Sequence, residues 1–151
     1  MNFTPVAAGS AATVPAAAVP AAAASVAVAP RLGRVLTAVN LLAAFMATVS
    51  AVLAFADPAI LGAPAVDSWL EIYAQAYVVR SVPIGLAVGA VLLVPALRTR
   101  PAVLVTLTVA GLAQVGDIAI GAAHGIAGMA VGATVGAVIH LGSVAVLARK
   151  R

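Results

Sequence analysis

Apolar and charged positions divide the chain into four long apolar runs separated by short polar boundaries. The runs cover about residues 35–56, 72–97, 101–123 and 129–148. A helix needs about 20 apolar residues to cross the hydrocarbon core of a bilayer, so each run is long enough for one spanning helix. The pattern predicts an all-α, polytopic membrane protein whose residues 31–151 form an antiparallel four-helix transmembrane bundle.

Local sequence signals mark where these helices begin and end. Asp57 and the following proline end the first run. Ser68 and Glu71 form an S-x-x-E capping box, with Ser68 as the N-cap and Glu71 at N3, which predicts that the second helix starts ahead of its apolar run. Pro83 lies inside the second run and predicts a kink there. Pro101 starts the third helix, because proline is favoured at the first helical position.

The basic residues predict the orientation in the membrane. Seven of the eight Lys and Arg residues lie in three clusters, at 31–34, 98–100 and 149–151, and the acidic residues between 57 and 71 lie on the other side of the first run. Basic loops stay in the cytoplasm. We therefore expect a multi-pass protein of the cell membrane with both termini cytoplasmic.

The first 30 residues differ from the rest of the chain. Residues 1–30 are mostly Ala, Val and Pro, and their prolines interrupt any helix. They predict a disordered, Ala/Pro-rich cytoplasmic tail. A second interpretation of the N-terminal part stays open, because Arg31, Arg34, the first run and the A-x-A sequence at 54–56 resemble a signal peptide cleaved after Ala56. The first run is longer than the usual h-region of roughly 7–15 residues, which favours a retained helix.

Composition excludes several classes of protein. The chain is 64% hydrophobic and only 8% charged, whereas a soluble domain is about 25% charged. Its net charge of +4 comes from helix borders rather than from a basic patch, which argues against a nucleic-acid partner. The chain has no Cys, so disulfides, thiolate chemistry and Cys-ligated metals are excluded.

Polar residues inside the spans are the candidates for function, because an ionisable group in a membrane helix is costly. At about 1.5 Å per residue, Arg80 lies roughly 27 Å from Arg98, and Asp117 lies roughly 24 Å from Pro101. Equal depth on adjacent antiparallel helices predicts that Arg80 and Asp117 pair. Side chains on the same faces extend the pair into a polar cluster that opens outward. Its candidate binding residues are Tyr73, Tyr77, Arg80, Gln114 and Asp117.

A glycine repeat precedes a histidine in the fourth run. Gly128, Gly132 and Gly136 follow one another at steps of four and lead to His140. This spacing places the three glycines on one helix face and is typical of a glycine zipper, which lets two helices approach closely.

His140 is the sixth candidate binding residue and lies near mid-membrane. We expect it to hydrogen-bond to the first span, at Asn40 or Thr37. No metal site is predicted, because the other histidine, His124, lies about 24 Å away along the chain if the helix is continuous.

Three segments together resemble the DoxX-like family of small four-helix membrane proteins. They are AYVVRSVPIGLAVGAVLL, GLAQVGDIAIGAAHG and VIHLGSVAVLA. The family pattern has an Arg in helix two before a Gly-rich stretch, a Gly-Asp in helix three and a His in helix four; these positions match Arg80 with Gly85, Asp117 with the glycine before it, and His140. The resemblance covers roughly residues 32–148. It implies a four-helix bundle and, for some members, association with quinone-linked or sulfur-linked membrane redox systems.

These observations favour a non-catalytic accessory subunit, or one that binds a small lipophilic ligand. No cofactor is predicted, and a quinone or a lipid is the candidate for a lipophilic ligand. Expected partners are the lipid bilayer and either a second copy or a membrane redox protein. One alternative is a membrane-embedded enzyme, with Asp117 as the general acid or base and Arg80 stabilising negative charge. A small proton-coupled carrier is the other. A purely structural lock between the second and third helices also explains the Arg80–Asp117 pair.

Overall fold

A computed structural model describes residues 33–63 and 65–149, and this part of the chain is built from four long helices. All four are long and apolar enough to cross a membrane. They are α1 (Arg34–Ala56), α2 (Ser68–Leu93), α3 (Arg100–Ala123) and α4 (Ala127–Arg149). The predicted all-α membrane fold is confirmed. The tail predicted for residues 1–30 lies outside the described residues.

Two of the predicted boundaries of α2 are wrong. The N-cap is Asp67 rather than Ser68, because Asp67 Oδ1 accepts a hydrogen bond of 2.9 Å from the backbone N–H of Leu70. The helix ends at Leu93, although its apolar run continues to residue 97. Pro95 explains the early end, since proline disfavours a helical conformation in the residue before it. Residues Pro95–Leu97 instead form a short 3-10 helix, η2.

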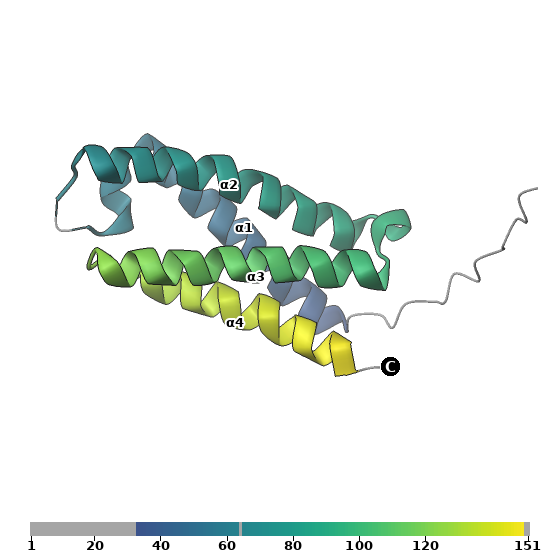
Figure 1. The fold of residues 1–151 in the computed structure, drawn as a ribbon. Helices are drawn as coiled ribbons and strands as arrows, with labels where there is room; N and C mark the ends of the chain where they lie inside the picture. Colours follow the sequence, from purple (N-terminus) through teal and green to yellow (C-terminus); the bar gives the residue numbers. More distant parts are fainter. Residues whose placement is uncertain (1–32, 64, 150–151) are drawn as a thin grey trace, which may run out of the picture.

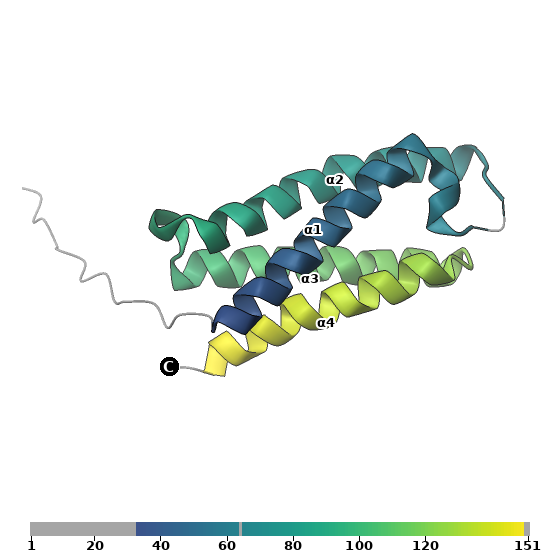
Figure 2. The same ribbon diagram turned by 180° about the vertical axis from the view of Figure 1, so that it is seen from behind.

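The four helices form two antiparallel hairpins, α1 with α2 and α3 with α4 (Figures 1 and 2). Between the hairpins, α2 lies along α3, and α1 lies beside the C-terminal part of α4 and diverges from it toward α2 (Figure 2). We call the end that carries segment 57–67 and the α3–α4 turn the distal end. The other, terminal end carries the start of α1, the α2–α3 connection and the end of α4.

Side-chain hydrogen bonds tie the elements of the terminal end together. Arg98 Nη2 donates to Thr37 Oγ1 at 2.9 Å, which links the α2–α3 connection to α1. Arg100 Nη2 donates to the carbonyl of Leu147 at 3.1 Å and so binds one of the last carbonyls of α4. A cationic side chain at a helix C-terminus also interacts favourably with the helix dipole.

Glycines allow the helices of each hairpin to approach closely. A Cβ added at Gly85 of α2 would collide with the side chain of Thr48 in α1. In the second hairpin, a Cβ at Gly121 of α3 would lie 2.9 Å from the backbone nitrogen of Ala130 in α4. Such positions are typical of membrane helix interfaces, where small residues let backbones come together.

The glycine zipper predicted for α4 is not supported. A Cβ at Gly132 would meet no atom within 4 Å, and one at Gly128 would meet only the carbonyl oxygen of Leu61, at 3.7 Å. Of the three glycines, only Gly136 faces another helix closely, with Gln114 of α3 at 3.1 Å. The i, i+4 spacing places these residues on one face of α4 but does not determine what lies opposite. Here that face borders a cavity.

The interior combines two apolar clusters with buried polar side chains. One apolar cluster lies toward the distal end and includes Leu70 and Ile126, and the other lies toward the terminal end and includes Val88 and Leu107. The buried polar residues are Asn40, Ser81, Asp117, His140 and Ser143. Because lipid offers no hydrogen bonds, each of these groups needs a partner inside the protein.

Candidate functional site

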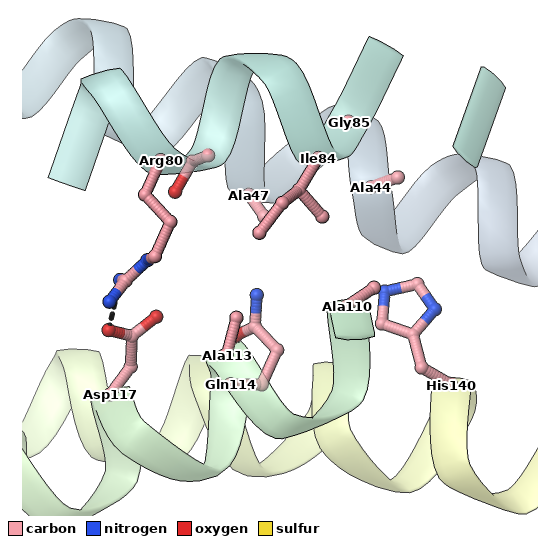
Figure 3. Close-up of a pocket in the computed structure, with 11 residues that line it drawn as sticks. Ala44, Ala47, Arg80, Ile84, Gly85, Ala110, Ala113, Gln114, Asp117 and His140 are labelled. Carbon is pink, nitrogen blue, oxygen red and sulfur yellow. Dashed lines mark hydrogen bonds and ion pairs between the residues drawn. The ribbon is translucent and has the colours of Figure 1, made fainter. Parts of the chain in front are cut away.

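Asp117 is the centre of the larger polar cluster. The residue is 2% exposed, and its Oδ1 accepts a 2.8 Å hydrogen bond from the hydroxyl of Tyr73. Arg80 Nη2 forms an ion pair with the same oxygen (Figure 3). The predicted contact between Arg80 and Asp117 is therefore present, and it joins α2 to α3.

The second carboxylate oxygen, Asp117 Oδ2, has no protein partner. It forms no hydrogen bond within residues 33–63 and 65–149, and the same holds for the hydroxyl of Tyr77 and the side-chain amide of Gln114. In the described part of the chain, Arg100 Nε is the one side-chain N or O atom that is both fully buried and without a partner. The unpaired atoms of Asp117, Tyr77 and Gln114 therefore each keep some accessible surface. Figure 3, which draws the smaller of two cavities beside these atoms, shows that the unpaired oxygen points toward Gln114 and that the Gln114 amide points into this small cavity.

A cavity of about 560 Å³ lies beside these atoms, between α1 and α4. We call it the lateral groove. Its polar residues are Tyr77, Gln114, Asp117 and Ser50, and the rest of its lining is apolar or glycine. Residues Leu42, Met46 and Val135 line it and are each at least half exposed on the surface of the bundle, so the groove opens sideways. Its remaining lining residues are Val39, Ala43, Ala47, Ile60, Leu61, Gly128, Met129, Gly132, Ala133, Gly136 and Ile139.

A much smaller cavity, of about 10 Å³, lies on the other side of Gln114. Arg80, Ser81, Asp117 and His140 line it (Figure 3). The two cavities share Gln114 and Asp117 in their walls, so they adjoin. Because one water needs a volume of about 10–15 Å³, the small cavity has room for about one water molecule.

An aromatic stack supports the cluster from the distal end. The ring of Trp69 stacks on His124 with centroids 3.7 Å apart and on Tyr73 at 5.6 Å. Tyr73 stacks in turn on Tyr77 at 5.8 Å, and the guanidinium of Arg80 lies 5.7 Å from the centre of the Tyr77 ring. Steps of four residues place the aromatic side chains of α2 on one face. Sequence reasoning found this face but missed the contact between Trp69 and His124, which lies at the end of another helix.

His140 belongs to a second polar cluster, shared between α4 and α1. Its Nδ1 lies 2.8 Å from Asn40 Oδ1, so the predicted contact with Asn40 is present. Asn40 Nδ2 donates to the backbone carbonyl of Leu36 and to Ser143 Oγ, both at 2.7 Å. A carbonyl can only accept, which fixes the orientation of the Asn40 amide. His140 must then donate from Nδ1, and its Nε2 is left as an acceptor.

The structure therefore divides the six predicted site residues into two groups. Tyr73, Tyr77, Arg80, Gln114 and Asp117 lie together on α2 and α3, and three of them border the lateral groove. His140 does not line the groove and meets the first group only across the small cavity. The α1 wall of the groove was missed, because its side chains are apolar and resemble any lipid-facing surface.

Within the described ranges, no three His, Asp or Glu side chains come together as a metal site would require. The chain matches no protein-family model, and no curated protein or solved structure is significantly similar to it.

Proposed function

We propose that this integral membrane protein binds an amphipathic, lipophilic molecule in the lateral groove, as a non-catalytic binding or accessory subunit. One observation carries the proposal: a cavity of about 560 Å³ with apolar walls reaches a buried carboxylate whose second oxygen has no partner among the described residues. Its volume lies within the range of about 300–1,000 Å³ that small-molecule sites occupy.

The surroundings of the groove support a ligand that comes from the bilayer. The exposed apolar residues at the rim would face lipid chains in a membrane, so a hydrophobic molecule can enter sideways without crossing water. An unpaired polar atom at membrane depth is costly. A ligand whose polar head reaches Asp117 would remove that cost, which favours an amphipathic molecule over a plain hydrocarbon.

The structural lock and the binding site use different oxygens of Asp117. Oδ1 holds α2 against α3 through Arg80 and Tyr73, and Oδ2 remains for a ligand. The same contacts weaken the enzyme alternative. Arg80 already offsets the charge of Asp117, so it is not free to stabilise a separate negative charge on a substrate.

Orientation and family are further parts of the proposal. Arg34, Arg98, Arg100 and Arg149 all belong to the terminal end, which supports a cytoplasmic location for both termini in the cell membrane. The family proposal, DoxX-like, rests on the sequence resemblance alone. If it holds, a quinone is one candidate ligand, whose reduced quinol form carries the hydroxyl that can donate to Asp117, and a membrane redox protein is one candidate partner.

A pair of glycine substitutions tests the groove. A Cβ at Gly132 or at Gly142 meets no atom within 4 Å, so α4 should tolerate leucine at either position. Only Gly132 lines the groove. The parent, Gly132→Leu and Gly142→Leu would be extracted in mild detergent and compared by native mass spectrometry.

We expect a co-purifying hydrophobic molecule on the parent and on Gly142→Leu, and little or none on Gly132→Leu. Equal occupancy in all three proteins, or no bound molecule on a folded parent, would contradict the proposal.

A further inference from the structure

The one ionised group that lines the lateral groove, Asp117, is balanced by an ion pair, so a ligand there meets no net charge. Among the described residues that line the groove, Asp117 is the one carboxylate and none is basic. Arg80 balances the negative charge of Asp117 from the side of the small cavity. Arg80 does not line the groove. A ligand in the groove therefore meets a carboxylate whose charge is already neutralised by Arg80.

The groove nevertheless offers hydrogen-bonding atoms without partners. Asp117 Oδ2 is an acceptor, the hydroxyl of Tyr77 both donates and accepts, and the amide of Gln114 also does both. None of these atoms hydrogen-bonds to another residue of the described part of the chain. Asp117 is 2% exposed and Tyr77 is 8% exposed, so a partner for these atoms comes from the groove or, for Asp117 and Gln114, also from the small cavity that they line.

Three kinds of ligand fit this arrangement poorly. A carboxylate head would lie against the carboxylate of Asp117, and like charges repel strongly where water is scarce. An ammonium head would add a positive charge to a pair already balanced by Arg80, and would leave that charge uncompensated in the membrane. A molecule without a polar head leaves Asp117 Oδ2 unpaired.

A hydroxyl fits, because one O–H group donates and accepts at the same time. We propose that the groove binds uncharged lipids with a hydroxyl head, that is, lipid alcohols. The hydroxyl donates to Asp117 Oδ2 and accepts from the hydroxyl of Tyr77 or the amide of Gln114. This inference rests on the proposed function, since it names the ligand class of the same groove.

Four molecules with one chain length separate the head-group classes. The delipidated full-length protein would be mixed in detergent, at neutral pH, with equal amounts of hexadecan-1-ol, hexadecanoic acid, hexadecylamine or hexadecane. Binding would be quantified by native mass spectrometry, which also reports a second protein copy. We expect the alcohol to bind about tenfold more tightly than the other three, the difference that one hydrogen bond to a charged group makes.

Two variants connect the preference to the groove. Tyr77→Phe removes a hydroxyl that has no partner in the described residues, so the fold should persist while the preference for the alcohol over hexadecane falls. Gly132→Leu fills the groove and should abolish binding of all four molecules, whereas Gly142→Leu should bind like the parent.

Other outcomes overturn the inference in distinguishable ways. If the acid, the amine or hexadecane binds as tightly as the alcohol, and Gly132→Leu still blocks binding, the head-group class is wrong but the groove binds lipid. If no molecule binds, or Gly132→Leu has no effect, the proposed function fails as well. A dimer that excludes all four molecules would show that a second copy fills the groove.

Discussion

Replacing Arg80 should destabilise the bundle more than replacing its partner, because the two side chains are buried to different extents. Asp117 has a side-chain exposure of 2%, whereas that of Arg80 is 35%. Arg80→Met leaves a buried carboxylate with only Tyr73 as a partner. Removing one partner of a buried ion pair costs roughly 3–5 kcal/mol, and we expect this loss in the free energy of unfolding.

Asp117→Asn should lower the free energy of unfolding by less than Arg80→Met does. The guanidinium of Arg80 keeps access to the surface of the bundle, so it is not left as a sealed, uncompensated charge. The loss then approaches that of a single hydrogen bond to a charged group, about 1.5–3 kcal/mol. The double variant should cost less than the sum of the two, with a coupling energy of up to about 3 kcal/mol.

The assay can use the protein's own fluorescence. Trp69 is the one tryptophan in the chain, and its ring stacks on His124 of the other hairpin at 3.7 Å. Its emission should change when the hairpins separate during titration of a mild detergent with sodium dodecyl sulfate. Strictly additive losses, or a larger loss for Asp117→Asn than for Arg80→Met, would refute the reasoning.

Three further predictions concern packing, the second polar cluster and orientation. Gly121→Ala should lower the free energy of unfolding by about 1–3 kcal/mol, because its Cβ would lie 2.9 Å from the backbone nitrogen of Ala130; an unchanged melting temperature would contradict this. Asn40→Leu removes the partner of His140 and should cost about 1–3 kcal/mol for each polar group left unpaired, measured by the same titration. A stable variant would show that the network is dispensable. Thr99→Cys, the only thiol in the chain, should react with a membrane-impermeant reagent from the cytoplasmic side alone, and labelling from outside would reverse the topology.

The sequence predicted those features that depend on properties of single helices. Helix positions follow from the apolar runs, since the bilayer requires a minimum length. The contact between Arg80 and Asp117 follows from their equal depth, which needs only the helix rise and the order of the helices. The contact between His140 and Asn40 was found in the same way.

Features that depend on how the helices are rotated about their axes could not be predicted. Gly132 has the spacing of an interface residue but faces the lateral groove, while Gly121 packs tightly against Ala130. Apart from a few polar side chains, both helices are apolar around their whole circumference, so the pattern does not indicate which glycine turns inward. The groove itself depends on the angle at which α1 diverges from α4, which no local pattern encodes.

The two hairpins described above are joined by contacts of a different kind from those inside each hairpin. Within a hairpin, small residues let the backbones meet, as at Gly85 and Gly121. Between the hairpins, the hydrogen bonds of Asp117 and Asn40 add specific polar contacts to the packing of the two apolar clusters. Lipid chains are as apolar as leucine, so the hydrophobic effect contributes little free energy to the association of helices that are already inserted. Each hairpin can therefore enter the bilayer as a separate unit, and the buried polar groups then determine the register in which the two halves dock. We therefore expect these residues to act late in biogenesis, by selecting the correct assembly of hydrophobic helices that are already inserted.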